Sequence, residues 1–141
     1  DNEYNARIRN AGYKIYFDPQ IISTYYSRPT LTSSVHQMYR NGRSIGVLLR
    51  TFPRAVGLRH VVPACFVVGM LSCLLFGWGV PILWNVLIWI LVVYWIAALG
   101  ATGLACLRFG FDMGFILPIL FFSVHIAYGT GTVYGFLTKK I

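Results

Sequence analysis

Residues 61–107 form an apolar stretch that contains no charged side chain. About twenty apolar residues in a helix cross the hydrocarbon core of a bilayer, which is about 30 Å thick. Only 11% of the chain is charged, which is too little to cover a soluble globule of this size. The sequence therefore predicts an integral membrane protein. We expect about three transmembrane helices within residues 60–141, at Val61–Val80, Ile82–Ala101 and Phe115–Leu137.

The basic residues indicate how the chain is oriented in the membrane. Nine of the twelve Lys and Arg lie within residues 1–59, so the positive-inside rule places the front of the chain in the cytoplasm. Arg108 then also falls inside, whereas Lys139 and Lys140 fall outside, against the trend. Basic residues beside the first apolar run suit an anionic membrane surface. Because they converge there and form no nucleic-acid module, we expect a multi-pass cell-membrane protein that binds lipids and no nucleic acid.

Residues 1–29 resemble the end of a soluble domain. Asp1–Asn10 is predicted to be a helix that stops at Gly12, where a left-handed backbone is easily adopted. Aromatic and β-branched residues predict strands at Tyr13–Phe17 and Ile21–Tyr26, joined by a turn at Asp18-Pro19. The expected fold class is therefore an α+β membrane protein fragment. We expect the chain to begin within a domain, so that its front completes a larger one.

Residues 30–59 are predicted to form an amphipathic helix, from Thr30 to about Arg50, and a hinge into the first span. At 100° per residue, Val35, Met38, Ile45 and Leu49 share one face, opposite a polar face that includes Gln37 and Arg40. Such a helix can lie along a membrane surface. Its two glycines, Gly42 and Gly46, weaken it, so packing must hold it.

The last apolar segment carries an unusual ionisable residue, His125. It either contacts a lipid-linked substrate or is a neutral imidazole bonded to a neighbouring helix, and on its own the second interpretation is favoured. Gly131 and Gly135 form a pair of small residues on one helix face that allows close helix packing.

Several short motifs carry a resemblance to a known family. They are Asp1-Asn2-Glu3-Tyr4-Asn5-Ala6-Arg7-Ile8-Arg9-Asn10-Ala11-Gly12-Tyr13, Asp18-Pro19, Arg28-Pro29-Thr30-Leu31, Gln37-Met38-Tyr39-Arg40-Asn41-Gly42, and His-x-x-Tyr-Gly-x-Gly from His125. In this order and spacing the chain resembles the carboxy-terminal part of membrane-bound family-2 glycosyltransferases, of the type that builds succinoglycan-like exopolysaccharide. The resemblance implies the end of a GT-A α/β domain and an inverting displacement on a nucleotide sugar. It also implies a lipid-linked oligosaccharide or polysaccharide acceptor at the cytoplasmic membrane face.

The resemblance implies roles for five residues. Asp1 matches the catalytic base, although on its own it would be interpreted as a helix N-cap. Gln37 and Arg40 match a Gln-x-x-Arg-Trp motif that holds acceptor and diphosphate, with Asn41 in place of the Trp; the alternative is two solvated polar residues. His125 and Tyr128 are candidate contacts to a lipid acceptor. A divalent metal, Mg or Mn, is expected at a site outside this chain.

One other class of function remains open from the residues. A non-enzymatic membrane transport or assembly component with a small cytoplasmic cap would share the apolar helices. It predicts polar pathways through the membrane, for which the apolar segments offer only His125 and a few hydroxyl groups.

Overall fold

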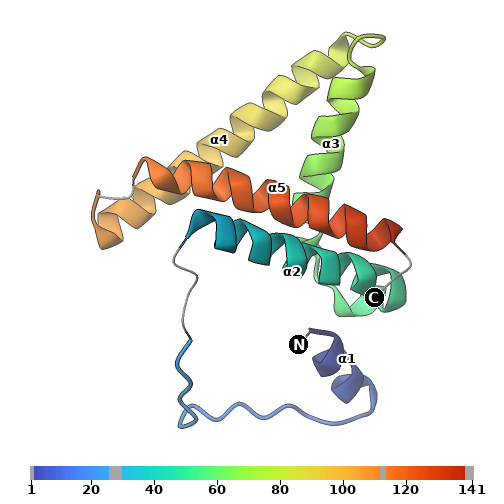
Figure 1. The fold of residues 1–141 in the computed structure, drawn as a ribbon, viewed down its shortest axis with the longest axis vertical. Coiled ribbons are helices and arrows are strands. Elements are labelled where there is room, and N and C mark those ends of the chain that lie inside the picture. Colours follow the sequence, from blue (N-terminus) through green and yellow to red (C-terminus); the bar gives the residue numbers. More distant parts are fainter. Residues whose placement is uncertain (1, 26–29, 112–113, 139–141) are drawn as a thin grey trace.

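A computed structural model of the chain describes residues 2–25, 30–111 and 114–138. Every regular element in these ranges is helical. The elements are α1 (Asn2–Asn10), α2 (Leu31–Thr51), η1 (Pro53–Ala55), η2 (Leu58–His60), α3 (Val62–Phe76), α4 (Ile82–Phe109) and α5 (Ile116–Leu137). Figure 1 shows α2 and α5 side by side along their length, with α3 and α4 rising from them as a hairpin.

The predicted α+β fold class is wrong for the part of the chain that the structure describes, because neither expected strand forms. Residues 13–18 and 21–25 are irregular, and Tyr26 lies outside the described residues. Tyr16, Phe17 and Ile22 are 83–90% exposed, so the segment packs against no sheet or core. Strand propensity depends on packing against neighbouring strands, and these ranges supply none. The end of a GT-A domain is therefore not seen here.

The end of the first helix and the following turn form where the sequence predicts them. Helix α1 ends before Gly12, which adopts a φ of 84°, and the Ala11 amide donates to the Arg7 carbonyl at 2.9 Å. The chain then turns at Asp18, whose Oδ1 accepts a hydrogen bond from the Gln20 amide at 2.9 Å.

Helix α2 forms where the sequence predicts a helix from Thr30 to about Arg50. Thr30 is its N-cap, with Oγ1 accepting a hydrogen bond from the Ser33 amide at 3.2 Å. The helix ends at Thr51, where the Phe52 amide donates to the Leu48 carbonyl before Pro53. Its buried residues are Gly42, Ile45, Gly46 and Leu48.

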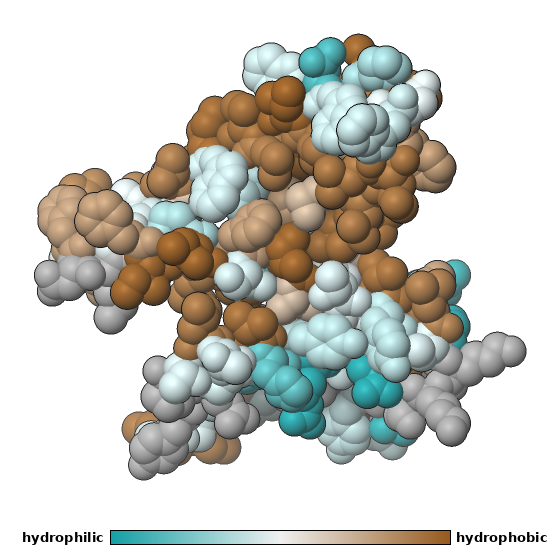
Figure 2. Space-filling model, turned by 45° about the horizontal axis from the view of Figure 1, so that its top comes forward, coloured by the Kyte–Doolittle hydropathy of each residue, from teal (hydrophilic) through white to brown (hydrophobic). Residues whose placement is uncertain are grey.

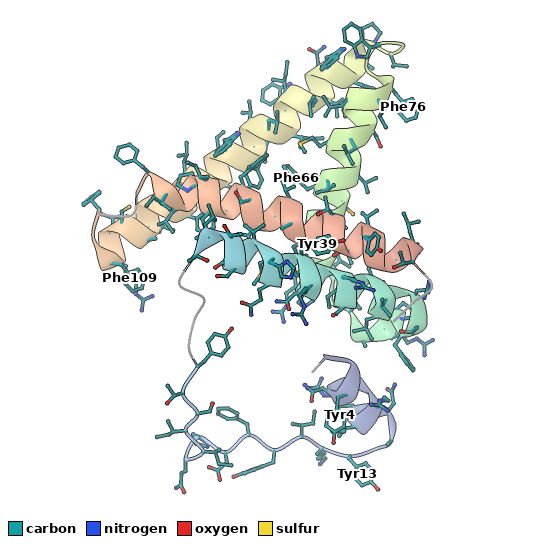
Figure 3. All side chains as sticks on the ribbon, viewed as in Figure 1. Tyr4, Tyr13, Tyr39, Phe66, Phe76 and Phe109 are labelled. Atoms are coloured by element: carbon teal, nitrogen blue, oxygen red, sulfur yellow. The ribbon has the colours of Figure 1, made fainter. Side chains whose placement is uncertain are left out.

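The prediction of three membrane spans needs correction at the first one. Helix α3 has 15 residues, about 22 Å, because the chain leaves the helix at Gly77 and turns before Pro81. Helices α4 and α5, with 28 and 22 residues, are long and apolar enough to cross a bilayer. The predicted hairpin does form. Trp78 and Trp84 pack edge to face at its turn, with centroids 5.9 Å apart. Figure 3 shows Phe66 between α3 and α4, where its ring stacks on Tyr94 at 4.8 Å.

Helices α2 and α5 run parallel and meet through glycines from both. A Cβ added at Gly42 would overlap the Tyr128 carbonyl oxygen and lie 3.1 Å from the Thr132 amide nitrogen. A Cβ at Gly131 would overlap the Tyr39 carbonyl oxygen in the same way. Thr132, at this contact, is only 1% exposed. The predicted close packing at small residues is therefore confirmed, and it explains how a helix weakened by glycine is held.

Candidate functional site

A groove of about 1120 Å³ opens between α2, η2, the start of α3, and α5. Arg40, Arg43, Arg59, His60, His125 and Tyr128 are among its polar lining residues. Its apolar lining includes Ile45 and Leu48 from α2, Pro63 from α3, and Val124 from α5. The groove thus combines basic groups with an apolar wall.

No Asp or Glu is among the residues that line the groove. No Asp or Glu occurs between Asp18 and Asp112, nor after Asp112, so no element that lines the groove carries a carboxylate. Arg40 and Arg59 are exposed, and the Arg43 guanidinium carbon lies 5.6 Å from the centroid of the Tyr134 ring. Guanidinium groups match the geometry of phosphate oxygens, so the groove is suited to a phosphate-bearing ligand.

A row of hydrogen bonds orients Tyr128 at the edge of the groove. Arg59 Nε lies 3.4 Å from His60 Nε2, and His60 Nδ1 lies 3.0 Å from Tyr128 Oη. Because an arginine nitrogen only donates, His60 Nε2 accepts and the neutral ring carries its proton on Nδ1. Nδ1–H therefore donates to Tyr128 Oη. The hydroxyl hydrogen of Tyr128 is then left to donate to a ligand.

His125 is held by α5 itself and by α4. Its Nδ1 lies 2.8 Å from the Phe121 carbonyl oxygen, which only accepts, so Nδ1 carries the proton. The Tyr94 hydroxyl lies 3.4 Å from the same nitrogen, and its ring packs edge to face on the imidazole at 5.6 Å. In the tautomer with its proton on Nδ1, Nε2 is a hydrogen-bond acceptor, on a residue that also lines the groove. The structural and ligand-contact interpretations are thus compatible.

The five predicted site residues do not all lie in the groove. Arg40 lines the groove with His125 and Tyr128. Gln37 does not line it, and its Nε2 donates to the Tyr25 hydroxyl at 3.0 Å. Asp1 lies outside the described residues. The structure therefore gathers three of the five predicted residues.

The sequence interpretation assigned no site role to Arg43, Arg59 or His60. The signal for the last two was a basic pair directly before the first apolar helix, which was interpreted only as a hinge. The structure shows that η2 turns this pair back toward α5, where His60 meets Tyr128.

The expected divalent metal concerns residues outside this chain, so it stays a prediction. Within the described ranges, no group of three His, Cys, Asp or Glu side chains is placed to hold a metal ion. Cys65, Cys73 and Cys106 are free thiols there.

Comparison with known proteins gives one informative similarity. The chain is 26% identical over 144 residues to the dolichyl N-acetyl-alpha-D-glucosaminyl phosphate 3-beta-D-2,3-diacetamido-2,3-dideoxy-beta-D-glucuronosyltransferase of Methanococcus voltae. The alignment covers 99% of this chain and 41% of that enzyme. No family model and no solved structure matches the chain. The similarity supports the prediction of a glycosyltransferase, and the two long apolar helices support membrane association.

Proposed function

We propose that this chain is the membrane-associated part of a glycosyltransferase, and that the groove receives the phosphate-bearing head of a lipid-linked acceptor. The observation that carries the proposal is that Arg40, Arg43 and Arg59 line the groove beside an apolar wall, with no Asp or Glu among the lining residues. The similar enzyme is named for a dolichyl-phosphate-linked acceptor, which has the same combination of phosphate and lipid.

The groove offers a separate contact for each part of such an acceptor. The guanidinium groups of Arg40 and Arg59 bind the phosphate oxygens, and Tyr128 donates its hydroxyl hydrogen to one of them. The first isoprenoid units lie against Leu48, Pro63 and Val124, because burying apolar surface stabilises the complex. A ligand that makes both contacts must carry both a negatively charged phosphate and a hydrocarbon chain.

The proposed chemistry is an inverting displacement of family-2 type, supported by the resemblance of the sequence motifs. Asp1 accepts the proton of the acceptor hydroxyl as its oxygen attacks the anomeric carbon of a nucleotide sugar, and the nucleoside diphosphate leaves. The motif match assigns Gln37 and Arg40 to the acceptor and the diphosphate; of the two, Arg40 lines the groove and Gln37 does not. A divalent metal would be held elsewhere in the protein. The product belongs to an exopolysaccharide or a lipid-linked oligosaccharide, built at the cytoplasmic face of the cell membrane.

Kinetics of single variants of the full-length protein test the role of the groove. Arg59→Gln raises the KM for a lipid-phosphate acceptor about tenfold, since a charge-assisted hydrogen bond contributes about 1.5 kcal/mol or more. The matched control is Arg54→Gln, because Arg54 lies in η1 and does not line the groove. An equal change in both variants would contradict a phosphate site in the groove.

The catalytic assignment has its own test. Asp1→Asn abolishes transfer while membrane insertion is retained, because the amide cannot accept the proton. Unchanged turnover would remove Asp1 from the mechanism and leave the groove proposal intact.

A further inference from the structure

Helices α2 and α5 stay together over nearly their whole length. Near the start of α2, Thr32 and Val35 line a second cavity together with Phe122 and Ser123 of α5. At the other end, Arg50 Nη1 donates to the Thr138 carbonyl oxygen at 2.8 Å. Between these points the backbones touch at glycine, so the two helices cannot diverge in direction.

Helix α2 is too polar to cross a bilayer. It carries Arg40, Arg43 and Arg50, with Arg40 and Arg50 exposed, besides a series of hydroxyl and amide side chains. Arginine at the centre of a membrane helix is strongly unfavourable, and three on one helix compound the cost. Figure 2 shows a cluster of hydrophilic side chains in the lower part of the view, a largely apolar surface above it, and a second polar patch at the top. A helix of this kind lies in the membrane interface.

Because α5 runs parallel to α2 in backbone contact, it must share that orientation. We infer that α5 does not cross the bilayer but lies in its interface beside α2, and that the α3–α4 hairpin alone enters the hydrocarbon (Figure 1). The exposed apolar residues of α5 then face the acyl chains; they include Ile116, Ile119, Phe136 and Leu137, which are 50–72% exposed. Both ends of the chain lie on the same side of the membrane.

The charge distribution supports this topology independently. If α5 crossed the membrane, Lys139 and Lys140 would lie opposite the other ten basic residues. With α5 in the interface, the hairpin returns the chain to the side that it left. All twelve Lys and Arg then lie on one side, as the positive-inside rule favours. The inference concerns the path of the chain and does not depend on the reaction.

Cysteine accessibility in the full-length protein tests the topology. Cys65, Cys73 and Cys106 are replaced by Ser, and single cysteines are introduced as Lys14→Cys, Lys140→Cys and Gly79→Cys. The first marks the front of the chain, and the last marks the hairpin turn, where a side chain has room. Sealed vesicles of both orientations are treated with a membrane-impermeant maleimide.

We expect K14C and K140C to react in vesicles of the same orientation, and G79C not to react in that orientation. Reaction of K140C only in the opposite orientation, or only after detergent is added, would overturn the inference. If the serine replacements prevent folding, a fluorescent protein fused to the C-terminus of the unaltered chain gives the same answer. Fluorescence is expected when both ends are cytoplasmic, and its absence from inserted protein would again refute the inference.

Discussion

The glycine contact between α2 and α5 makes a quantitative prediction for Gly135→Ala. A Cβ at this position would overlap the Arg43 carbonyl oxygen and lie 2.8 and 2.9 Å from the Arg43 carbonyl carbon and Cα. All three are backbone atoms of α2, so no rotamer change can relieve the contact. The two helices must move apart by about 1 Å, because non-bonded carbons prefer about 3.5–4 Å.

The expected loss of stability is the difference between two terms. Forcing a methyl group into a filled contact costs about 1–3 kcal/mol, and a rigid backbone places this case near the upper end. Alanine regains about 1 kcal/mol over glycine as a helix former. The net destabilisation is therefore about 2 kcal/mol.

Gly103→Ala is the matched control, since Gly103 lies in α4 and an added Cβ would have nothing within 4 Å. It gains the helix propensity without the clash, so the two variants differ by about 3 kcal/mol. Thermal unfolding in mild detergent, followed by circular dichroism, measures the difference as about 5 °C or more in midpoint. If Gly135→Ala is as stable as Gly103→Ala, the close backbone contact described here is wrong.

Two further predictions concern the groove and the start of α2. Tyr128→Phe removes the hydroxyl that His60 orients, so it raises the acceptor KM about threefold to tenfold with little change in kcat. Tyr134→Phe, outside the groove, changes neither constant. Steady-state kinetics with a lipid-phosphate acceptor measures both variants, and equal KM values would contradict a hydroxyl contact to the acceptor. Thr30→Ala removes the N-cap of α2 and lowers the free energy of unfolding by about 1 kcal/mol, whereas Thr30→Ser retains the cap. The same unfolding assay measures both variants, and an unchanged midpoint for Thr30→Ala would show that the cap does not stabilise the protein.

Some helix ends and turns of the fold could be predicted from the sequence, because each depends on a few neighbouring residues. Gly12, the Asp18 turn and the hairpin turn before Pro81 each depend on the chemistry of a few neighbouring residues. The expected strands failed because a strand needs partners, which no local pattern can supply. The first span was predicted too long because hydropathy continues through Gly77–Val80, whereas the helix does not.

Only part of the candidate site could be predicted from the sequence, because the rest depends on contacts between segments that are far apart in the chain. Arg40, His125 and Tyr128 were recognised through motifs, and the structure brings them to one groove. Arg59 and His60 were missed as site residues, since their role depends on η2 turning them toward a helix that is distant in sequence. Gln37 was expected beside Arg40 by helical spacing, but the two residues contact different parts of the chain.

The groove is built from segments that are far apart in the sequence, and this determines when it can form during synthesis. Arg50 and Thr138, at the end of the α2–α5 contact, are 88 residues apart. At 5–20 residues per second a ribosome needs about 4–18 s to make that distance. Until then α2 has no helix to cover its glycines, and the groove lacks the wall that α5 supplies. The proposed acceptor site therefore cannot form during synthesis before α5 has been made and has packed against α2.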